Sequence, residues 1–351
     1  MKNKTIFYLF ICTITLLSFS FTEFNGQLSS WAIIPKQEVS PNIIGLRYIP
    51  EMKINKGELF DMPIDGYFAL NINASGEINK SNFSSNLSLY RGWLRYTSAQ
   101  SETRLGLQKI NFGPAKILRS LQWFDQMSPT DPLGLTNGVS GLLTRYYSLD
   151  NNNVWLWALV GNEDLKGFET TKTLKNSIEI GGRYQFPFYL GELGLSSHTR
   201  QIQNGGQSGN EYRLGFDGEW DVGFGLWLET TIQKTNAPWL TEWKHVRTLG
   251  VDTTIEVGSG LHILLEHQNT SAGSELFKTN KLSDISALSA DYPLNMLDSV
   301  SAIITRVWTL DKNSFFISWQ RTLDEWSVNV SAFNDEVLAN SGVQVMIAIN
   351  H

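Results

Sequence analysis

Apolar and polar residues alternate strictly along many stretches of this sequence. In residues 211–220, Tyr212 and Leu214 fall on one face of an extended chain, whereas Arg213 falls on the other. Residues 178–186 repeat the pattern with different side chains. A period of two residues is the period of a β-strand with one apolar face, and an α-helix would show a period near 3.6. The sequence therefore predicts an all-β fold.

The alternating segments have the length of membrane-spanning strands. Many of them run to nine residues or more, as a tilted transmembrane strand requires. After the N-terminal region, the longest uninterrupted apolar run, residues 154–160, is far shorter than the roughly 18 residues of a spanning helix. Charged residues make up only 18% of the chain, and aromatic residues make up 12%. A soluble sandwich would also alternate, but these features favour a transmembrane, antiparallel, up-and-down β-barrel.

The N-terminus has the layout of a secretory signal peptide. Two lysines precede an almost uncharged apolar run over residues 6–21, which is too short to cross a bilayer comfortably. We predict a signal peptide over residues 1–26, with cleavage after Ser20 as the alternative. Residues 27–351 then form a single outer-membrane β-barrel domain.

Composition argues against several classes of function. The sole cysteine, Cys12, lies within the predicted signal peptide, so we expect no disulfide, no thiolate metal site and no cofactor. A net charge of −6 does not suit a nucleic-acid partner. Ser196 and His198 share a strand face, but a polar lumen lining explains them more simply than a nucleophile and its base. We therefore do not expect an enzyme.

The strand count decides how the barrel closes. Seventeen segments read as strands, and a single-chain bacterial barrel needs an even number. Either residues 31–36 add a strand and give 18, or one early segment lies outside the wall and gives 16; we prefer 18. Connections alternate in length, with short turns on one side and long ones on the other, including residues 163–175, 201–210 and 269–282. Barrels of this class keep short turns on the periplasmic side.

One hairpin carries an unusual set of arginines. A two-residue turn at Ala99-Gln100 fixes which residues lie opposite one another on the two strands. The pairs are Arg91 with Gln108, Trp93 with Gly106, and Arg95 with Arg104. Two arginines facing each other on a lipid-exposed surface would be very unfavourable. We therefore predict that this face points into a watery lumen, where a carboxylate or a bound anion neutralises the charges.

A long connection over residues 113–137 follows this hairpin, and it carries Arg119, Trp123, Asp125 and Asp131. Two readings stay open. In the first, it is a surface loop packed on its neighbours. In the second, it folds into the lumen as a constriction, which would bring the two aspartates towards the arginines.

A second hairpin adds Arg183 and Glu192, which the turn arithmetic places on one face as polar lumen lining. The full set of candidate residues for the lumen and its constriction is Arg91, Trp93, Arg95, Arg104, Gln108, Arg119, Trp123, Asp125, Asp131, Arg183 and Glu192.

The same region carries a family resemblance. The strand RLGLQKINFG (residues 104–113) leads into Trp123-Phe124-Asp125 and then Pro129-Thr130-Asp131-Pro132. This pattern resembles a family of uncharacterised porin-like outer-membrane barrels of Gram-negative bacteria, and it is more distantly similar to alginate-export-type porins. The resemblance implies a barrel in outer-membrane lipid, inserted by the barrel-assembly machinery. The C-terminus departs from the usual assembly signal, because it ends in Asn350-His351 rather than in an aromatic residue.

Two functions are compatible with these observations. The first is a porin-like channel in which small hydrophilic solutes, with anionic or dipolar solutes as the candidates, diffuse passively and are filtered by width and by lumen charge. The second is a closed structural barrel that anchors a partner protein. The sequence favours the channel and does not identify the solute.

Overall fold

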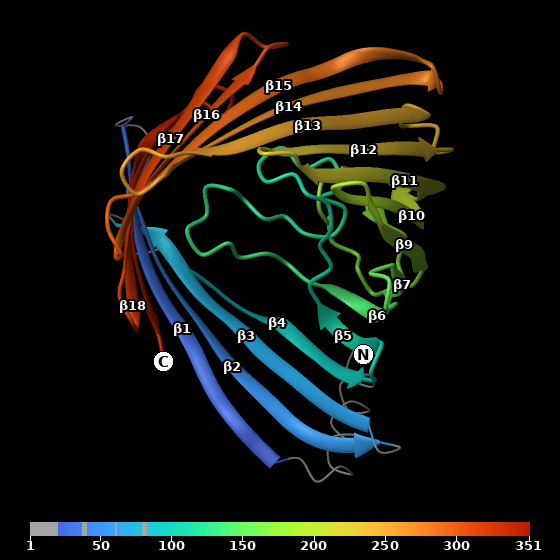
Figure 1. Ribbon diagram of the computed structural model, residues 1–351, viewed down its shortest axis with the longest axis horizontal. Helices are drawn as coiled ribbons and strands as arrows, with labels where there is room; N and C mark the ends of the chain where they lie inside the picture. The colour runs from blue at the N-terminus through green and yellow to red at the C-terminus, as the bar shows by residue number, and fades with distance from the viewer. Residues whose placement is uncertain (1–19, 37–40, 60–61, 79–82) are drawn as a thin grey trace.

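The computed structural model describes residues 20–36, 41–59, 62–78 and 83–351, and it is built almost entirely of β-strands (Figure 1). The strands are β1 (Ser20–Pro35), β2 (Ile43–Leu59), β3 (Met62–Glu77), β4 (Phe83–Thr97), β5 (Ser101–Gln108), β6 (Val139–Tyr147), β7 (Asn153–Val160), β8 (Lys172–Thr173), β9 (Ile178–Phe188) and β10 (Gly191–Asn204). They continue with β11 (Gln207–Asp221), β12 (Gly225–Thr235), β13 (Trp243–Ile255), β14 (Leu261–Glu275), β15 (Lys278–Pro293), β16 (Asp298–Val307), β17 (Lys312–Thr322), β18 (Trp326–Asp335) and β19 (Asn340–Asn350).

The strands form a closed antiparallel barrel. Each long strand pairs with its neighbours in sequence, and β1 pairs with both β2 and β19, which closes the ring. The two-residue strand β8 only extends the pairing of β10 beyond the point where β9 begins. The wall therefore has 18 strands. This confirms the all-β barrel and the preference for 18 strands over 16.

The N-terminal closure uses a longer strand than the sequence indicated. The extra strand was predicted over residues 31–36, whereas β1 begins at Ser20 and pairs along β2 from its first residue. Gly26 exchanges two main-chain hydrogen bonds with His351, at 2.9 and 3.0 Å. Residues 1–19 of the predicted signal peptide lie outside the described residues.

Two of the predicted long loops are instead tight hairpins. The strands β10 and β11 continue through residues 201–210 and meet at Gly205 and Gly206, whose φ angles of 55° and 86° suit a two-residue hairpin turn. Likewise, β14 and β15 cover most of residues 269–282. Polar residues and glycine predominate in these strand ends, so apolar alternation is too sparse to reveal them.

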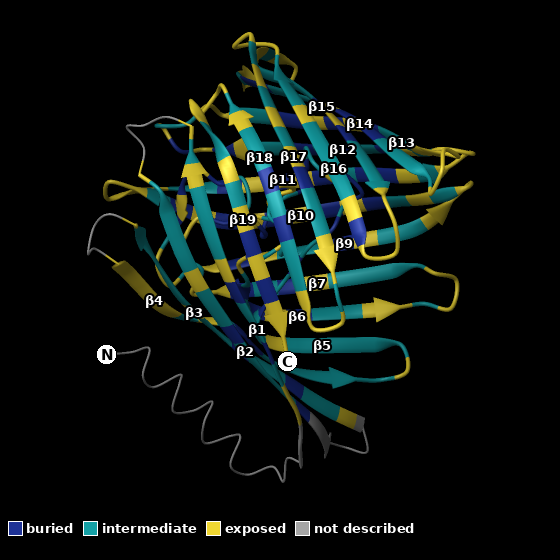
Figure 2. Cartoon of the chain, turned by 90° about the vertical axis from the view of Figure 1, so that its left-hand side faces the viewer, coloured by how far each residue is buried: buried dark blue, intermediate teal, exposed yellow. Residues whose placement is uncertain are grey.

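The barrel is apolar outside and polar inside. On β11, Leu214 is 61% exposed, whereas its neighbour Arg213 is 1% exposed. The same alternation of exposed and buried positions continues along strands such as β19 (Figure 2). A soluble sandwich would bury its apolar face and expose its charges, so this inverted arrangement identifies an exterior suited to lipid contact.

Among the described residues, no helix is long and apolar enough to cross a membrane.

Candidate functional site

The connection between β5 and β6, residues 109–138, lies inside the barrel (Figure 1). Trp123 and Phe124 are almost fully buried, and the ring of Phe112 packs against both. Phe124 also packs against the inner residue Trp157, and all four belong to one apolar cluster. This cluster is an apolar core within the lumen rather than on the barrel surface. This placement corresponds to the inward one of the two arrangements considered for residues 113–137.

Two buried carboxylates hold this inner segment to the opposite wall. Glu229 on β12 accepts hydrogen bonds from the main-chain N–H groups of Ala115 and Leu121, at 2.9 and 3.0 Å. Glu266 on β14 accepts main-chain hydrogen bonds at 2.5 to 3.0 Å from the three consecutive residues 116–118. Both glutamates are 0% exposed. The two oxygens of a carboxyl group can accept several N–H groups at once, so the two side chains act as a latch, which we call the Glu229–Glu266 latch.

A second connection, residues 161–177, fills the lumen beside the first. Its Glu169 accepts from Arg200 and Arg213 at 2.9 and 3.0 Å, and both arginines also reach Glu211. Its Lys166 lies 3.0 Å from Glu179. Every member of this network is buried, and each charge has an opposite partner, as burial requires. This part of the barrel interior is solid rather than open.

The predicted arginine hairpin has the expected register. Trp93 lies opposite Gly106, and Arg95 lies opposite Arg104. The opposed arginines are neutralised by carboxylates: Asp65 is 2.8 Å from Arg95, and Glu102 is 3.3 Å from Arg104. Both guanidinium groups also lie over the ring of Trp93, at 5.6 and 5.0 Å.

Gly106 is required at its position. Its φ is 127°, and an added Cβ would lie 2.1 Å from the carbonyl oxygen of Gly92. No other residue can take this conformation without strain. Gly106 therefore lets β5 approach the main chain of Gly92 and Trp93 on β4 closely.

Among the described residues, Asp125 and Asp131 form no ion pair with the arginines of this hairpin. Asp125 pairs with Arg119 of its own segment, at 2.6 Å. Asp131 accepts from the main-chain N–H groups of Leu133 and Leu135, both at 3.0 Å. Short-range partners along the same segment satisfy these carboxylates first, because they need no long-range loop closure.

The remaining candidates have separate surroundings. Gln108 is buried and donates to the carbonyl oxygen of Gly141, at 3.2 Å. Arg183 makes a bidentate pair with Asp217, at 2.5 and 2.7 Å. Glu192 instead faces one end of the barrel, where Gln185 donates to it. The structure thus does not bring the candidates together into one site.

Three cavities follow the side of the lumen formed by β1 to β4. They measure about 290, 200 and 540 Å³. The first lies at the long-loop end beside residues 161–166, and the last reaches Glu325 and His351 at the short-turn end. The first and second share Asn71, and the second and third share Ile49. We call this series the Tyr90 path, because Tyr90 lines all three cavities.

A β-bulge places Tyr90 in the lumen. On β4, Arg91 pairs with Ala69 and Leu89 pairs with Leu70, so Tyr90 is the extra residue between them. A bulge of this kind redirects a side chain that simple alternation would send outward. The guanidinium of Arg91 lies 4.1 Å from the Tyr90 ring and donates to the carbonyl of Thr136 on the inner segment, at 2.7 Å. Tyr90 is thus held between the wall and the inner segment.

Arg47 on β2 lines the middle cavity of this path. Its guanidinium lies 5.5 Å from the ring of Trp31, and its Nε is buried with no hydrogen-bond partner among the described residues. Arg91 donates only to main-chain carbonyls. The other arginines that line the lumen pair with carboxylates; they are Arg95, Arg104, Arg119, Arg145, Arg183, Arg200 and Arg213. Arg47 makes no ion pair among the described residues, and Asp131, the carboxylate that lines the same cavity, accepts hydrogen bonds from main-chain N–H groups of its own segment.

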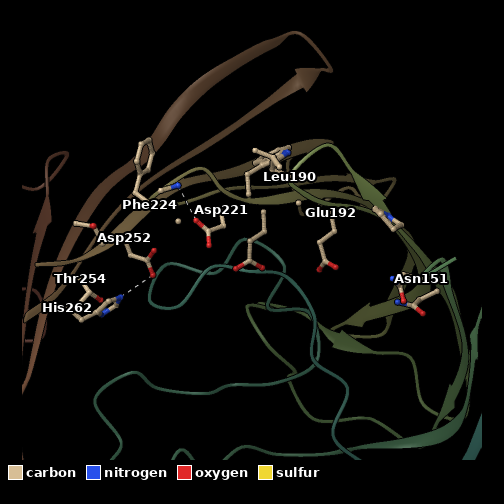
Figure 3. A pocket seen from close by; sticks show the side chains of 16 residues that line it. Asn151, Leu190, Glu192, Asp221, Phe224, Asp252, Thr254 and His262 are labelled. Atoms are coloured by element: carbon tan, nitrogen blue, oxygen red, sulfur yellow. Dashed lines mark hydrogen bonds and ion pairs between the residues drawn. The ribbon is translucent and has the colours of Figure 1, made fainter. Parts of the chain in front are cut away.

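A larger hollow of about 950 Å³, which we call the vestibule, opens at the short-turn end (Figure 3). Its lining includes the carboxylates of Glu192, Glu219, Asp221 and Asp252. His262 lies 3.1 Å from Asp252, and the close view marks this contact with a dashed line (Figure 3). Within the described residues, no group of three or more His, Cys, Asp or Glu side chains is arranged to hold a metal ion.

Sequence reasoning missed Tyr90, Arg47 and the Glu229–Glu266 latch. Strict alternation from Arg91 assigns Tyr90 to the lipid face, and only the bulge reverses it. Arg47 lies in the LRYIPE stretch (residues 46–51), but nothing in one sequence shows which arginines lack a partner. The latch joins residues more than 100 positions apart, so local patterns carry no signal for it.

Comparison with known proteins supports the fold. No protein-family model matches the sequence, and no curated protein matches it. OccK2 (OpdF) from Pseudomonas aeruginosa, solved with glucuronate, matches with a TM-score of 0.63 at 10% identity over 93% of this chain and 95% of that one. The outer membrane protein OpdK from the same organism, solved with vanillate, gives 0.61 at 10% identity over 93% and 97%.

OccAB1 from Acinetobacter baumannii gives a TM-score of 0.59 at 8% identity, over 93% of this chain and 95% of that one. At such low identities, the likeness shows the fold alone. Because it covers nearly the whole of each chain, it extends to the complete barrel.

Proposed function

We propose that this protein is a passive outer-membrane channel, through which small hydrophilic solutes diffuse along the Tyr90 path. The observation that carries the proposal is a series of three cavities sharing Tyr90, within a closed barrel that is apolar outside. Width and lumen charge would act as the filter, without energy coupling.

The favoured solutes are small organic anions. Arg47 is half-buried at the middle cavity, and its guanidinium makes no ion pair among the described residues. A cation without an ion-pair partner in a narrow passage favours an anionic solute. The structural neighbours OccK2 and OpdK were solved with glucuronate and vanillate, both of which carry a carboxylate. Both observations support a carboxylate that passes Arg47 while its polar remainder contacts Asn71, Gln126 or Asn137.

The same proposal includes the cellular location of the protein and the orientation of the barrel in the membrane. The apolar exterior suits the outer membrane of a Gram-negative bacterium, reached by way of a cleaved signal peptide and the barrel-assembly machinery. The short turns would face the periplasm, and the long connections would face outward. A relationship to alginate-export-type porins remains a prediction from the sequence.

Planar-bilayer recording of the purified protein tests the channel. We expect discrete conductance steps, larger in Tyr90→Ala because removing the ring joins the three cavities. Tyr90→Phe keeps the ring and is the matched control, so its conductance should stay at the wild-type value. If no steps appear in any of the three proteins, the channel proposal is rejected and the closed scaffold becomes the better reading.

A solute test uses the same bilayers. Glucuronate added to one side should lower the KCl current of the wild type by occupying the path. Glucose, which is of similar size and uncharged, should have a weaker effect. Equal effects of the two sugars would reject the preference for anions while leaving the channel itself in place.

A further inference from the structure

The strand β4 is paired on both edges along only part of its length. On one edge, β3 pairs with it from Tyr96 to Phe83. On the other edge, β5 pairs only with residues 92–97, because the chain leaves the wall after Gln108 and turns into the lumen (Figure 1). The second edge of residues 83–91 therefore has no strand beside it among the described residues.

The outer part of this edge is exposed. All of residues 83–87 are exposed, including those that alternation directs inward, and this part of β4 is yellow beside its label in Figure 2. Leu87 is 66% exposed and Phe83 is 57% exposed. We call residues 83–89 the free β4 edge. An open sheet edge does not occur in hydrocarbon, so this edge lies beyond the apolar layer, at the end of the barrel that carries the long connections.

Two other strand ends in this part of the wall are covered. The side chain of Asn162 accepts from the main-chain N–H of Ser140 on β6, at 2.7 Å, and donates to its carbonyl oxygen, at 2.9 Å. Further along the same connection, β8 pairs with Ile202 and Gln203 of β10. The connection of residues 161–177 thus covers β6 and β10, but it forms no main-chain pairing with β4 among the described residues.

The sequence of the free β4 edge lacks the usual protection. Edge strands are normally guarded by charged side chains or proline, because an open edge pairs readily with another chain. Residues 83–89 read FSSNLSL, with no charged residue and no proline. Leu87 and Leu89 alternate with serine and asparagine, so an incoming strand would meet apolar side chains on one face and small polar ones on the other.

The unpaired main chain decides the kind of ligand. An open edge presents N–H and C=O groups in a regular row, with the spacing of a strand. Another extended main chain complements that row, whereas a sugar, a small anion or a lipid headgroup does not repeat donors and acceptors at this spacing. Two copies of this barrel in one membrane would be related by an axis along the membrane normal. Their tilted strands would then cross instead of aligning, so a segment of a different polypeptide fits better.

The charge beside the edge narrows the ligand further. Leu89 lines the cavity of about 290 Å³ from β4, and Glu163 and Asp164 line it from the facing connection. The cation in this lining, Lys166, is buried in ion pairs with two other glutamates. Asp164 lies 3.5 Å from Lys172, but both side chains are exposed to water, which weakens such a pair. A segment along the edge therefore meets an excess of negative charge, which favours lysine or arginine.

We propose that the free β4 edge binds an extended, basic segment of another polypeptide by strand addition. The incoming main chain would lie about 4.8 Å from β4 and would take the place that β5 leaves when it turns inward. The location at the cell surface rests on the orientation in the proposed function, whereas the binding itself does not depend on channel activity.

The test measures binding of a fluorescent peptide of alternating valine and lysine to the purified, folded barrel in zwitterionic detergent, by fluorescence anisotropy. Its matched control is the same peptide with every main-chain nitrogen methylated, which keeps the side chains and removes the N–H donors. We expect the methylated peptide to bind at least about tenfold more weakly, because strand addition consists of several main-chain hydrogen bonds. A purely electrostatic association would not distinguish the two peptides.

Changes in the barrel locate the site. Leu87→Lys places a cation beside the edge and should weaken binding of the lysine peptide, as should Glu163→Gln combined with Asp164→Asn. Leu338→Lys is the matched control, since Leu338 is 74% exposed at the tip of the β18–β19 hairpin, and it should bind as the wild type does. Hydrogen–deuterium exchange should show slower exchange of amides in residues 83–89 when the peptide is bound.

Several outcomes would overturn the proposal. These are no binding of the lysine peptide to the wild type, equal binding of the methylated peptide or of a glutamate–valine peptide, and slower exchange confined to other strands. Dimers in sedimentation that Leu87→Lys abolishes would assign the edge to a second copy of this chain instead. Circular dichroism checks that each variant is folded. Because anisotropy needs no current, a barrel that binds the peptide but shows no conductance steps would reject the channel and keep this proposal.

Discussion

At the residue scale, most of the arginines that line the lumen form ion pairs with carboxylates, whereas Arg47 forms none among the described residues. The paired ones have carboxylate partners, and buried partners of this kind hold one another in fixed geometry. Arg91 is held by two main-chain carbonyls. Arg47 has neither arrangement within the described residues, and it faces a cavity. A solute passing this point therefore meets a guanidinium that makes no ion pair among the described residues, in a cavity that the carboxylate of Asp131 also lines.

Replacing Arg47 tests its role in ion selection. We expect Arg47→Gln to lower the anion-to-cation permeability ratio roughly two- to fivefold, because a unit charge in a narrow, partly dehydrated passage acts on every ion that passes. The reversal potential in a KCl gradient measures this ratio. Arg306→Gln is the control, since Arg306 pairs with Asp311 at the tip of the β16–β17 hairpin. A reversal potential that shifts equally in both variants would contradict the assignment.

A second residue-scale prediction concerns the buried ion network. Arg213 contacts Glu169 and Glu211, and all three side chains are buried. Arg213→Met should destabilise the barrel by about 3–5 kcal/mol, because it leaves buried carboxylates short of a partner. The midpoint of chemical unfolding, followed by tryptophan fluorescence, measures the effect. Arg306→Met, at an exposed hairpin tip, should change the midpoint little; an equal shift would mean that the network adds no stability.

Whether the sequence predicts the partner of a side chain depends on how far apart the two residues lie in the sequence. The hairpin register followed from one two-residue turn, so Trp93 opposite Gly106 could be predicted. Arg183 and Asp217 face each other from strands that are not neighbours. No turn length fixes such a pair. The register of neighbouring strands can therefore be predicted from the sequence, whereas side-chain partners on strands that are not neighbours cannot.

At the scale of elements, the inner segment is held by a few strong contacts. Glu266 alone accepts three consecutive main-chain N–H groups, and the indole of Trp227 also donates to it, at 3.1 Å. Hydrogen bonds to a charged acceptor stabilise by roughly 1.5–3 kcal/mol each. Glutamates on distant strands hold this segment inside the lumen. Local sequence patterns cannot match these glutamates to their main-chain donors, so the sequence alone did not decide between the two readings of the segment.

Weakening the latch should make the inner segment mobile. We expect Glu266→Gln to increase open-channel current noise and to lower the unfolding midpoint, because a neutral amide offers one acceptor oxygen where the carboxylate offers two. Single-channel recording and thermal melts measure the two effects. Glu275→Gln on the same strand is the control, since Glu275 is exposed at the hairpin tip. Quiet, stable channels in Glu266→Gln would show that other contacts suffice.

At the scale of the whole molecule, the alternating pattern was sufficient for the architecture. Every strand of the wall faces lipid on one side and the polar lumen on the other, so apolar and polar residues alternate along it with a period of two. The same pattern therefore recurs in strand after strand. The pattern failed where that constraint ends: at polar strand tips such as those of β10 and β11, and at the closing strand. There β1 continues to Ser20, inside the region that was predicted to be removed.

This closing strand leads to a prediction about the mature N-terminus. Cleavage before Gln27 would remove Phe24, Asn25 and Gly26, which pair with β2, and would abolish the two hydrogen bonds between Gly26 and His351. Cleavage after Ser20 keeps all of them and leaves small residues at Ser18 and Ser20, as signal processing prefers.

We therefore expect the intact mass of the protein purified from outer membranes to correspond to a chain starting at Phe21. As a check on the physical reason, a chain engineered to start at Gln27 should refold with a lower unfolding midpoint than one that starts at Phe21. Deleting residues 21–26 removes one side of the pairing that holds the C-terminal residue to the wall. A natural N-terminus at Gln27, or equal stability of the two chains, would mean that the barrel closes through residues 27–35 of β1 alone.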